Sequence, residues 1–129
     1  MMLLGATLLA TSMAWADWDS ARFSELDTLD FLTVGPDDDE HWSRVWLVVL
    51  DGDVYVRLGS RAADRVEGNT RAPLVDVRIG DETFTGVRVE PMPDMTERVA
   101  EAMAEKYSTD VLVRYLAHPL TARLVPSEN

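Results

Sequence analysis

The stretch of sequence that decides the fold is Val45-Trp46-Leu47-Val48-Val49-Leu50-Asp51-Gly52-Asp53-Val54-Tyr55-Val56-Arg57-Leu58. Two apolar runs rich in β-branched residues flank Asp51-Gly52, a pair that favours a tight type I′ turn. A two-residue loop fixes the register, and the predicted pairs on one face are Val49 with Val54, Leu47 with Val56, and Val45 with Leu58. Because side chains alternate along a strand, this wholly apolar face is expected to lie in the core.

The other face of this hairpin is mixed in character. It pairs Val48 with Tyr55 and Trp46 with Arg57, so an indole, a phenol and a guanidinium stand beside an apolar side chain. Such a face suits a partner subunit or a flat ligand better than open water. One reading of Arg57 is a cation–π contact with Trp46, worth about 0.5–1 kcal/mol when exposed.

A second hairpin is predicted over residues 75–90, with its turn at Gly80-Asp81. Its first strand alternates between apolar and charged side chains, as in a sheet with one face in the core. In its second strand the inward positions shift between Phe84 and Val87, and Gly86 at that point indicates a β-bulge.

Helical spacing occurs in two further regions. Residues 61–70 predict a short polar helix between the hairpins, and Asp94–Glu97 resembles a capping box at the start of a second helix. The apolar stripe of that second helix is Met95, Val99, Met103 and Tyr107. Its spacing indicates core packing. Residues 109–117 predict another short helix and residues 121–126 a closing strand. Hairpins followed by helices indicate an α+β fold with a mainly antiparallel sheet.

The first 16 residues read as a secretory signal. They carry no charge, and an apolar run leads to the small-residue pattern Ala14-Trp15-Ala16, which predicts cleavage before Asp17. No Lys or Arg precedes the apolar run, and the run is shorter than the about 20 residues of a membrane span. We therefore expect an exported protein, periplasmic or secreted, without stable membrane insertion and with one domain over residues 17–129. The alternative is a buried first element of a cytoplasmic protein.

Charge and composition exclude several functions. The formal net charge is −11, which disfavours nucleic acids and anionic membranes because both attract basic faces. The run Asp37-Asp38-Asp39-Glu40 predicts a solvated loop and lacks the ligand spacing of a calcium loop. There is no cysteine, so thiol catalysis and cysteine-ligated metals are excluded. The two histidines, His41 and His118, do not suggest a metal site, and no catalytic triad order is present.

The chain also resembles a known group of proteins. Four pieces carry the likeness in the expected order: residues 46–57, residues 71–77, Glu105-Lys106-Tyr107 and residues 121–126. They resemble the FMN-binding split-barrel proteins, relatives of pyridoxamine 5′-phosphate oxidase that include deazaflavin-dependent reductases. The likeness spans residues 42–126 and is nearest to an uncharacterised branch.

The resemblance implies a six-stranded split barrel that forms a homodimer, with any FMN or deazaflavin across the dimer interface. It implies that Arg57, Ser60 and Arg61 hold the cofactor phosphate, with Arg65 a weaker candidate, and that Trp46 and Tyr55 line the ring pocket. Arginine binds phosphate in bidentate fashion, and a helix starting near Ser60 would add amide donors. Ala62-Ala63-Asp64 departs from the aromatic or Lys-rich stretch often found there, and an aspartate beside a phosphate site is unfavourable.

Two functions follow from these residues. One is a flavin- or deazaflavin-dependent oxidoreductase whose catalytic residues the sequence does not identify. The other is a cofactor-free binding or interaction module of the same fold. For Arg57 the phosphate reading and the cation–π reading both stay open.

Overall fold

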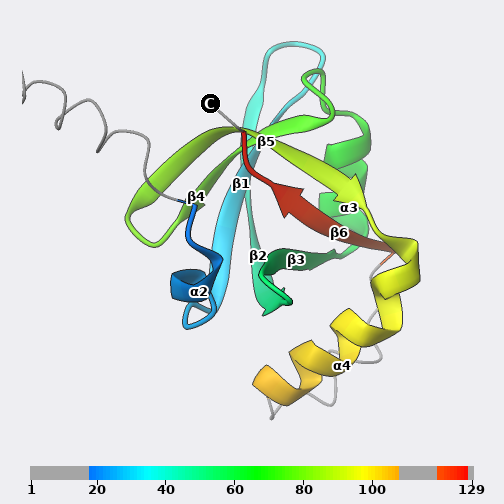
Figure 1. Ribbon diagram of the computed structural model, residues 1–129. Coiled ribbons are helices and arrows are strands. Elements are labelled where there is room, and N and C mark those ends of the chain that lie inside the picture. Colours follow the sequence, from blue (N-terminus) through cyan, green and yellow to red (C-terminus); the bar gives the residue numbers. More distant parts are fainter. Residues whose placement is uncertain (1–17, 108–118, 128–129) are drawn as a thin grey trace, which may run out of the picture.

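The computed structural model describes residues 18–107 and 119–127 (Figure 1). Six strands form one closed barrel in the order β1-β2-β3-β6-β5-β4, and neighbouring strands are antiparallel. The strands are β1 (Thr28–Val34), β2 (Glu40–Leu50), β3 (Asp53–Leu58), β4 (Leu74–Ile79), β5 (Glu82–Pro91) and β6 (Leu120–Val125). The helices are α2 (Ser20–Phe23), α3 (Ser60–Glu67), the 3₁₀ turn η1 (Pro93–Met95) and α4 (Thr96–Lys106).

This architecture confirms the predicted fold class, an α+β protein built on a small six-stranded, antiparallel split barrel. The predicted signal peptide and the predicted helix at residues 109–117 lie outside the described residues. No helix among residues 18–107 and 119–127 has both the length and the apolar character needed to cross a membrane.

The β2–β3 hairpin forms in the predicted register. Leu47 faces Val56, Val48 faces Tyr55 and Val49 faces Val54. Asp51 and Gly52 have φ angles of 53° and 84°, and a type I′ turn requires positive φ at both of these positions.

The strand pairing of this hairpin ends earlier than predicted. The two strands separate beyond the Leu47–Val56 pair, so Val45 with Leu58 and Trp46 with Arg57 are not paired partners. Barrel closure explains this, because Val45 pairs with Leu29 of β1 and Leu58 pairs with Leu120 of β6. Both Val45 and Leu58 are nevertheless buried.

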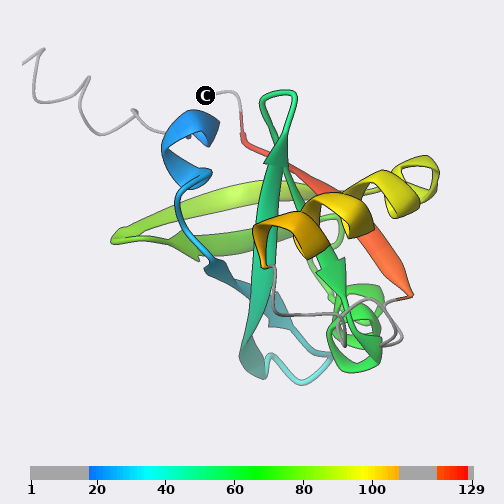
Figure 2. The same cartoon turned by 90° about the horizontal axis from the view of Figure 1, so that it is seen from below.

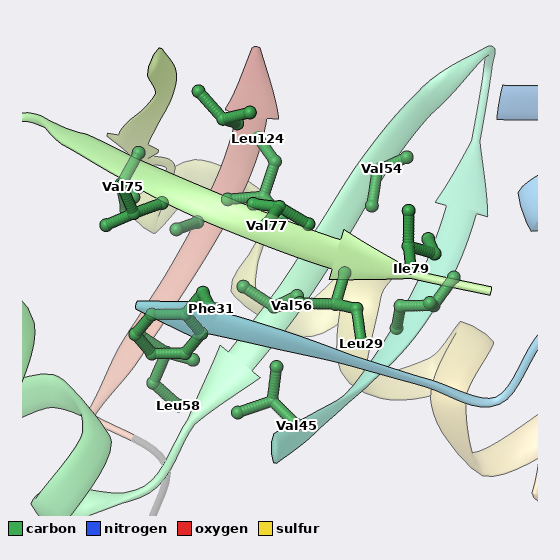
Figure 3. Close-up of a cluster of buried hydrophobic side chains, with 14 of the residues drawn as sticks. Leu29, Phe31, Val45, Val54, Val56, Leu58, Val75, Val77, Ile79 and Leu124 are labelled. Atoms are coloured by element: carbon green, nitrogen blue, oxygen red, sulfur yellow. The ribbon is translucent and has the colours of Figure 1, made fainter. Parts of the chain in front are cut away.

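The barrel interior is one apolar cluster to which all six strands contribute (Figure 3). Its fully buried members include Leu29, Leu47, Val56, Val77 and Val87. These residues alternate with outward side chains along each strand, as a half-buried strand requires. The predicted inward face of the first hairpin is thus core, except that Val49 is only half-buried and packs at its margin.

The β4–β5 hairpin contains the predicted bulge. Val77 pairs with Phe84, but Val75 pairs with Val87, so β5 holds one extra residue between the two pairs. Gly86 has a φ of 66°, which a residue with a side chain would adopt only under strain. The bulge lets β5 keep Val87 and Val89 in the core after the shift.

Strand β1 and the first half of β2 were not anticipated from the sequence. The strand that was predicted to begin at Val45 begins at Glu40. The acidic run forms the turn between β1 and β2, where the Gly35 amide donates to the Asp39 carbonyl at 2.9 Å. All four carboxylate residues of the run are exposed, as predicted, although Glu40 belongs to the strand.

Two short helices close opposite ends of the barrel. At one end Phe23 of α2 contacts Trp18 and Phe84 edge to face, with ring centroids 5.2 and 5.8 Å from its own. At the other end α3 packs Ala62, Ala63 and Val66 against the core, as the helical spacing of residues 61–70 predicted.

Helix α4 lies across the outer side of β2 and β3 (Figure 2). The predicted apolar stripe is confirmed, because Met95, Val99, Met103 and Tyr107 all belong to the cluster between α4 and the sheet. The predicted capping box is wrong. The Thr96 hydroxyl donates to the Pro93 carbonyl at 2.9 Å, and no side chain caps the helix, because the 3₁₀ turn η1 precedes it.

Candidate functional site

The candidate site lies on the outer side of β3 and β6. Pairing of these strands sets Tyr55 beside Arg123 and Arg57 beside Thr121. Their neighbours Val56 and Ala122 point into the barrel. Since side chains alternate along a strand, the two pairs form adjacent rows on the outer surface.

Arg57 is the unusual member of this surface. Its Nε and Nη1 atoms are buried, and no acceptor among residues 18–107 and 119–127 bonds to either. Burial lowers the pKa of Arg57 from its ordinary 12.5, but an arginine remains charged in a protein. A buried donor left unpaired costs about 1–3 kcal/mol, and more when it is charged. This guanidinium is therefore suited to receive an oxyanion.

Thr121, the strand partner of Arg57, has the same property. Its residue is 3% exposed, and its Oγ1 bonds to no group in the described part of the chain. The Thr121 carbonyl is already used, because it accepts the Met92 amide at 2.8 Å. As strand partners, Arg57 and Thr121 place a charge and an unpaired hydroxyl side by side in the described part of the sheet.

Arg123, in the neighbouring row, has carboxylate partners for its guanidinium. Its Nε and Nη2 lie 3.2 and 2.6 Å from Glu90 Oε1, and its Nη1 lies 3.5 Å from Asp53. The hydrogen bond to Glu90 is the main reason that the pKa of Arg123 is raised. Arg123 is thus neutralised within the chain, whereas Arg57 has no carboxylate partner among the described residues.

The two predicted ring-pocket residues lie beneath α4. Tyr55 is 4% exposed and packs with Val99 and Met103 of the helix. Trp46 stacks on Tyr107, with ring centroids 4.9 Å apart and planes at 25°. We expected a partner subunit or a flat ligand to cover this face. That expectation is wrong, because helix α4 of the same chain covers it. The cation–π reading gains no support, since Trp46 faces Tyr107.

The remaining predicted phosphate ligands lie on α3, which follows β3 directly. Ser60 and Arg61 are exposed on the first turn of α3, beyond Gly59, which provides no side-chain cap. Arg65 points elsewhere, into a hollow of about 200 Å³ that it shares with His41. The structure therefore makes Thr121 the strand partner of Arg57, and the assignment of Ser60 and Arg61 to the phosphate stays a prediction.

The end of α4 is fixed to the barrel by polar contacts. Lys106 Nζ donates to the Leu26 carbonyl at 2.6 Å and to the Leu47 carbonyl at 3.2 Å. The Tyr107 hydroxyl lies 2.7 Å from the carbonyl oxygens of Asp27 and Leu47. Burial lowers the pKa of Lys106 and raises that of Tyr107 to about 12. Tyr107 therefore stays neutral near pH 7 and serves to hold the helix.

Comparison with known proteins gives structural likeness alone. No protein-family model matches the sequence, and no curated protein matches it. HutZ, the heme storage protein from Vibrio cholerae, is 20% identical over 84% of this chain and 88% of its own, with a TM-score of 0.62. An F420-H2 dependent reductase is 13% identical over 77% of this chain and 94% of its own, with a TM-score of 0.58.

A third solved structure is described as a domain-swapped dimer. It is 14% identical over 78% of this chain and 80% of its own, with a TM-score of 0.56. Likenesses at these identities establish that the chain has the split-barrel fold, as the sequence resemblance implied.

Proposed function

We propose that the protein binds a flavin or deazaflavin by its phosphate, at Arg57 and Thr121, and acts as an oxidoreductase. The observation that carries this proposal is the guanidinium of Arg57, which has two buried nitrogen atoms without an acceptor in the described chain. The F420-H2 dependent reductase of the same fold and the sequence resemblance both support a cofactor of this kind.

The phosphate end of such a cofactor fits the residues present. Arginine forms short charge-assisted hydrogen bonds to phosphate oxygens, and the buried Thr121 hydroxyl adds a neutral donor beside it. The ring end fits less completely within one chain, because α4 covers Tyr55. A complete ring pocket would then need residues of a second copy, as the resemblance implies.

The chain's own residues have defined tasks in this proposal. A bound flavin or deazaflavin supplies the hydride chemistry. Arg57 holds and orients the phosphate, and Thr121 donates to one of its oxygens. The packing of Val99 and Met103 on Tyr55 keeps water from the sheet next to this anchor.

Titration of the protein with FMN and with F420, followed by absorbance and fluorescence, tests this proposal. We expect saturable binding that Arg57→Ala weakens about tenfold to a hundredfold, since one charged hydrogen bond contributes about 1.5–3 kcal/mol. Arg78→Ala is the matched control, because it removes an exposed arginine on β4, which pairs with β1 and β5 and does not border β3 or β6. Equal affinity in the Arg57→Ala variant would refute the assignment of the anchor.

One observation favours the second function, a cofactor-free binding module. Helix α4 already fills the outer face of β2 and β3, where Val48 is 6% and Tyr55 4% exposed. Under this alternative the site takes another oxyanion, and the heme storage protein of the same fold makes a haem propionate the first to test. Hemin binding that depends on Arg57, without binding of FMN or F420, would select this reading.

We also propose that the protein is exported and forms a homodimer. The apolar leader with its predicted cleavage site near Ala16 supports export. The domain-swapped dimer of the same fold supports self-association. N-terminal sequencing of protein expressed with its leader tests the first, and an N-terminus at Asp17 is expected. Sedimentation velocity tests the second, and a single monomeric species at all concentrations would contradict it.

A further inference from the structure

The Arg57 site offers a single positive charge to a ligand. Within residues 18–107 and 119–127, Arg57 forms no ion pair with a carboxylate, so its charge is available in full. Its strand partner Thr121 contributes a hydroxyl, which is neutral. The two side chains together therefore carry a charge of +1 to whatever binds them.

The neighbouring row of the sheet adds no positive charge to this site. Arg123 lies 2.6 Å from Glu90 and 3.5 Å from Asp53, so it would have to give up a carboxylate before it could bind another anion. Both carboxylates also repel an anion at the Arg57 row, which is about 7 Å away along the strands. Arg61 of α3 is exposed, and exposed charges contribute little because water screens them.

The burial of Arg57 limits how much charge its ligand can carry. The Nε and Nη1 atoms are buried, so an oxygen atom that bonds to them has to lose part of its hydration. The cost of taking an ion out of water rises with the square of its charge, whereas its attraction to one fixed cation rises only in proportion to that charge. A second charge on the ligand thus doubles the attraction and quadruples the cost. The net charge of −11 opposes that second charge further.

We propose that the Arg57 site selects an oxyanion with one negative charge, a phosphate diester or a carboxylate, over a phosphate monoester with two. This inference rests on the anchor assigned in the proposed function and narrows the class of its ligand. F420 carries its phosphate as a diester and FMN carries it as a monoester, so the deazaflavin is the better ligand of the two. A haem propionate meets the same charge requirement.

The test uses two small phosphate esters as probes. Dimethyl phosphate has one charge throughout, whereas methyl phosphate has one charge at about pH 5 and close to two at about pH 8, because its second pKa is about 6. Binding is followed by the NMR shift of the Arg57 guanidinium carbon, which is assigned by its absence from the spectrum of Arg57→Met. All titrations are made at one ionic strength.

The ratio of the two affinities is the quantity compared, because dimethyl phosphate reports any pH response of the protein itself. Relative to dimethyl phosphate, we expect methyl phosphate to bind about tenfold more weakly at the higher pH than at the lower. Arg78→Met is the matched control. It removes an exposed arginine of β4, a strand that does not border β3 or β6, and it should leave both affinities unchanged.

The outcomes separate this inference from the proposed function. If methyl phosphate binds equally well or better at the higher pH, the charge preference is wrong, and the anchor stands where cofactor binding still depends on Arg57. If dimethyl phosphate binds at Arg57 and neither FMN nor F420 binds, the oxidoreductase proposal is wrong and the charge preference stands. A resonance that neither probe shifts, even at high concentration, overturns the preference and the anchor together. Displacement of dimethyl phosphate by F420 or by hemin supports the preference and identifies which of the two sources supplies the anion.

Discussion

At the scale of single residues, two arginines on the outer side of β3 and β6 differ in their hydrogen bonding: Arg123 is paired with carboxylates, and Arg57 is not paired with any among the described residues. Arg123 is bound by Glu90 and Asp53, so its burial is compensated inside the chain. Arg57 has two buried nitrogens with no acceptor in the described chain, and burial lowers its pKa. Stability alone favours an apolar side chain at position 57. A charge kept there at the expense of stability is typical of a binding site.

The first prediction concerns this balance. Arg57→Met keeps the length of the side chain and removes the unpaired charge, so we expect the free energy of unfolding to stay equal or to rise by about 1–2 kcal/mol. Arg123→Met removes the 2.6 Å ion pair of Glu90 and leaves it only the 3.9 Å contact with Arg88, so it should lower the free energy of unfolding. Urea unfolding of the protein without ligand measures both. A clear loss of stability in Arg57→Met would mean that the guanidinium is satisfied in the folded chain.

The second prediction concerns alkaline pH. The pKa of Tyr107 is raised from 10.0 to about 12, mainly by burial, so the folded chain favours the neutral phenol. Its contribution to stability is complete below pH 10 and is lost as the pH rises from 10 to about 12. Lys106 acts in the opposite direction, because its pKa is lowered by burial.

The difference between the native chain and Tyr107→Phe isolates the tyrosine. We expect this difference in unfolding free energy to be constant up to about pH 10 and to shrink above it. In a titration followed by tyrosinate absorbance, one phenol should ionise at a higher pH than an ordinary tyrosine. A difference that does not change between pH 9 and 12 would contradict the buried contact of Tyr107 with the carbonyls of Asp27 and Leu47.

At the scale of elements, the local signals of the sequence were sufficient for the hairpins. Asp51-Gly52 and the flanking alternation predicted the β2–β3 turn and register, and Gly86 predicted the bulge. Strand β1 was not predicted, because it lacks the alternation of apolar and polar residues that marks a half-buried strand. Four consecutive residues are buried in it: Phe31, Leu32, Thr33 and Val34. The start of β2 was not predicted, because its polar residues are typical of a loop.

The candidate site was predictable only in part, for a reason that also belongs to this scale. Arg57 was identified because it lies in a strand that resembles the phosphate-binding strand of the split-barrel family. Ser60 and Arg61 were assigned with it from the family resemblance; both are exposed at the start of α3, and their assignment stays a prediction. Thr121 was missed, because the pairing of β3 with β6 joins distant segments. The cover of Tyr55 by α4 is likewise a tertiary contact.

The third prediction tests the turn that organises the first hairpin. Gly52 has a φ of 84°, and a Cβ added there would meet no atom within 4 Å. Gly52→Ala is therefore unfavourable only because alanine rarely adopts this backbone conformation. We expect it to lower the unfolding free energy by about 1 kcal/mol. Gly68→Ala is the control, because Gly68 has a φ of −87° and its added Cβ would lie 3.5 Å from the nearest atom. Equal effects in thermal unfolding would argue against the type I′ turn.

At the scale of the whole molecule, closure and charge dominate. The six described strands close into a barrel without a free edge, so copies cannot associate by adding a strand at a sheet edge. The net charge of −11 opposes contact between copies over most of the surface. The proposed dimer therefore has to form against this repulsion.

The fourth prediction follows from this charge. Salt shortens the range of repulsion, to about 8 Å at 0.15 M ionic strength, so raising ionic strength from about 0.02 M to 0.15 M should tighten the dimer. Sedimentation equilibrium at both concentrations measures the change. A dimer that weakens with salt would mean that attraction between opposite charges holds the copies together.

The position of β6 has a further consequence for how the chain reaches this state. β6 is the last of the six strands in the sequence, yet it lies between β3 and β5 and pairs with both. Until residues 120–125 have been synthesised, those two strands have no neighbour on one side, and the barrel is a five-stranded ribbon with two open edges. The native state is thus reached only after translation has passed this strand, because its non-local pairings form last. A chain that stays open during synthesis can still be threaded through a translocation channel, as the proposed export would require.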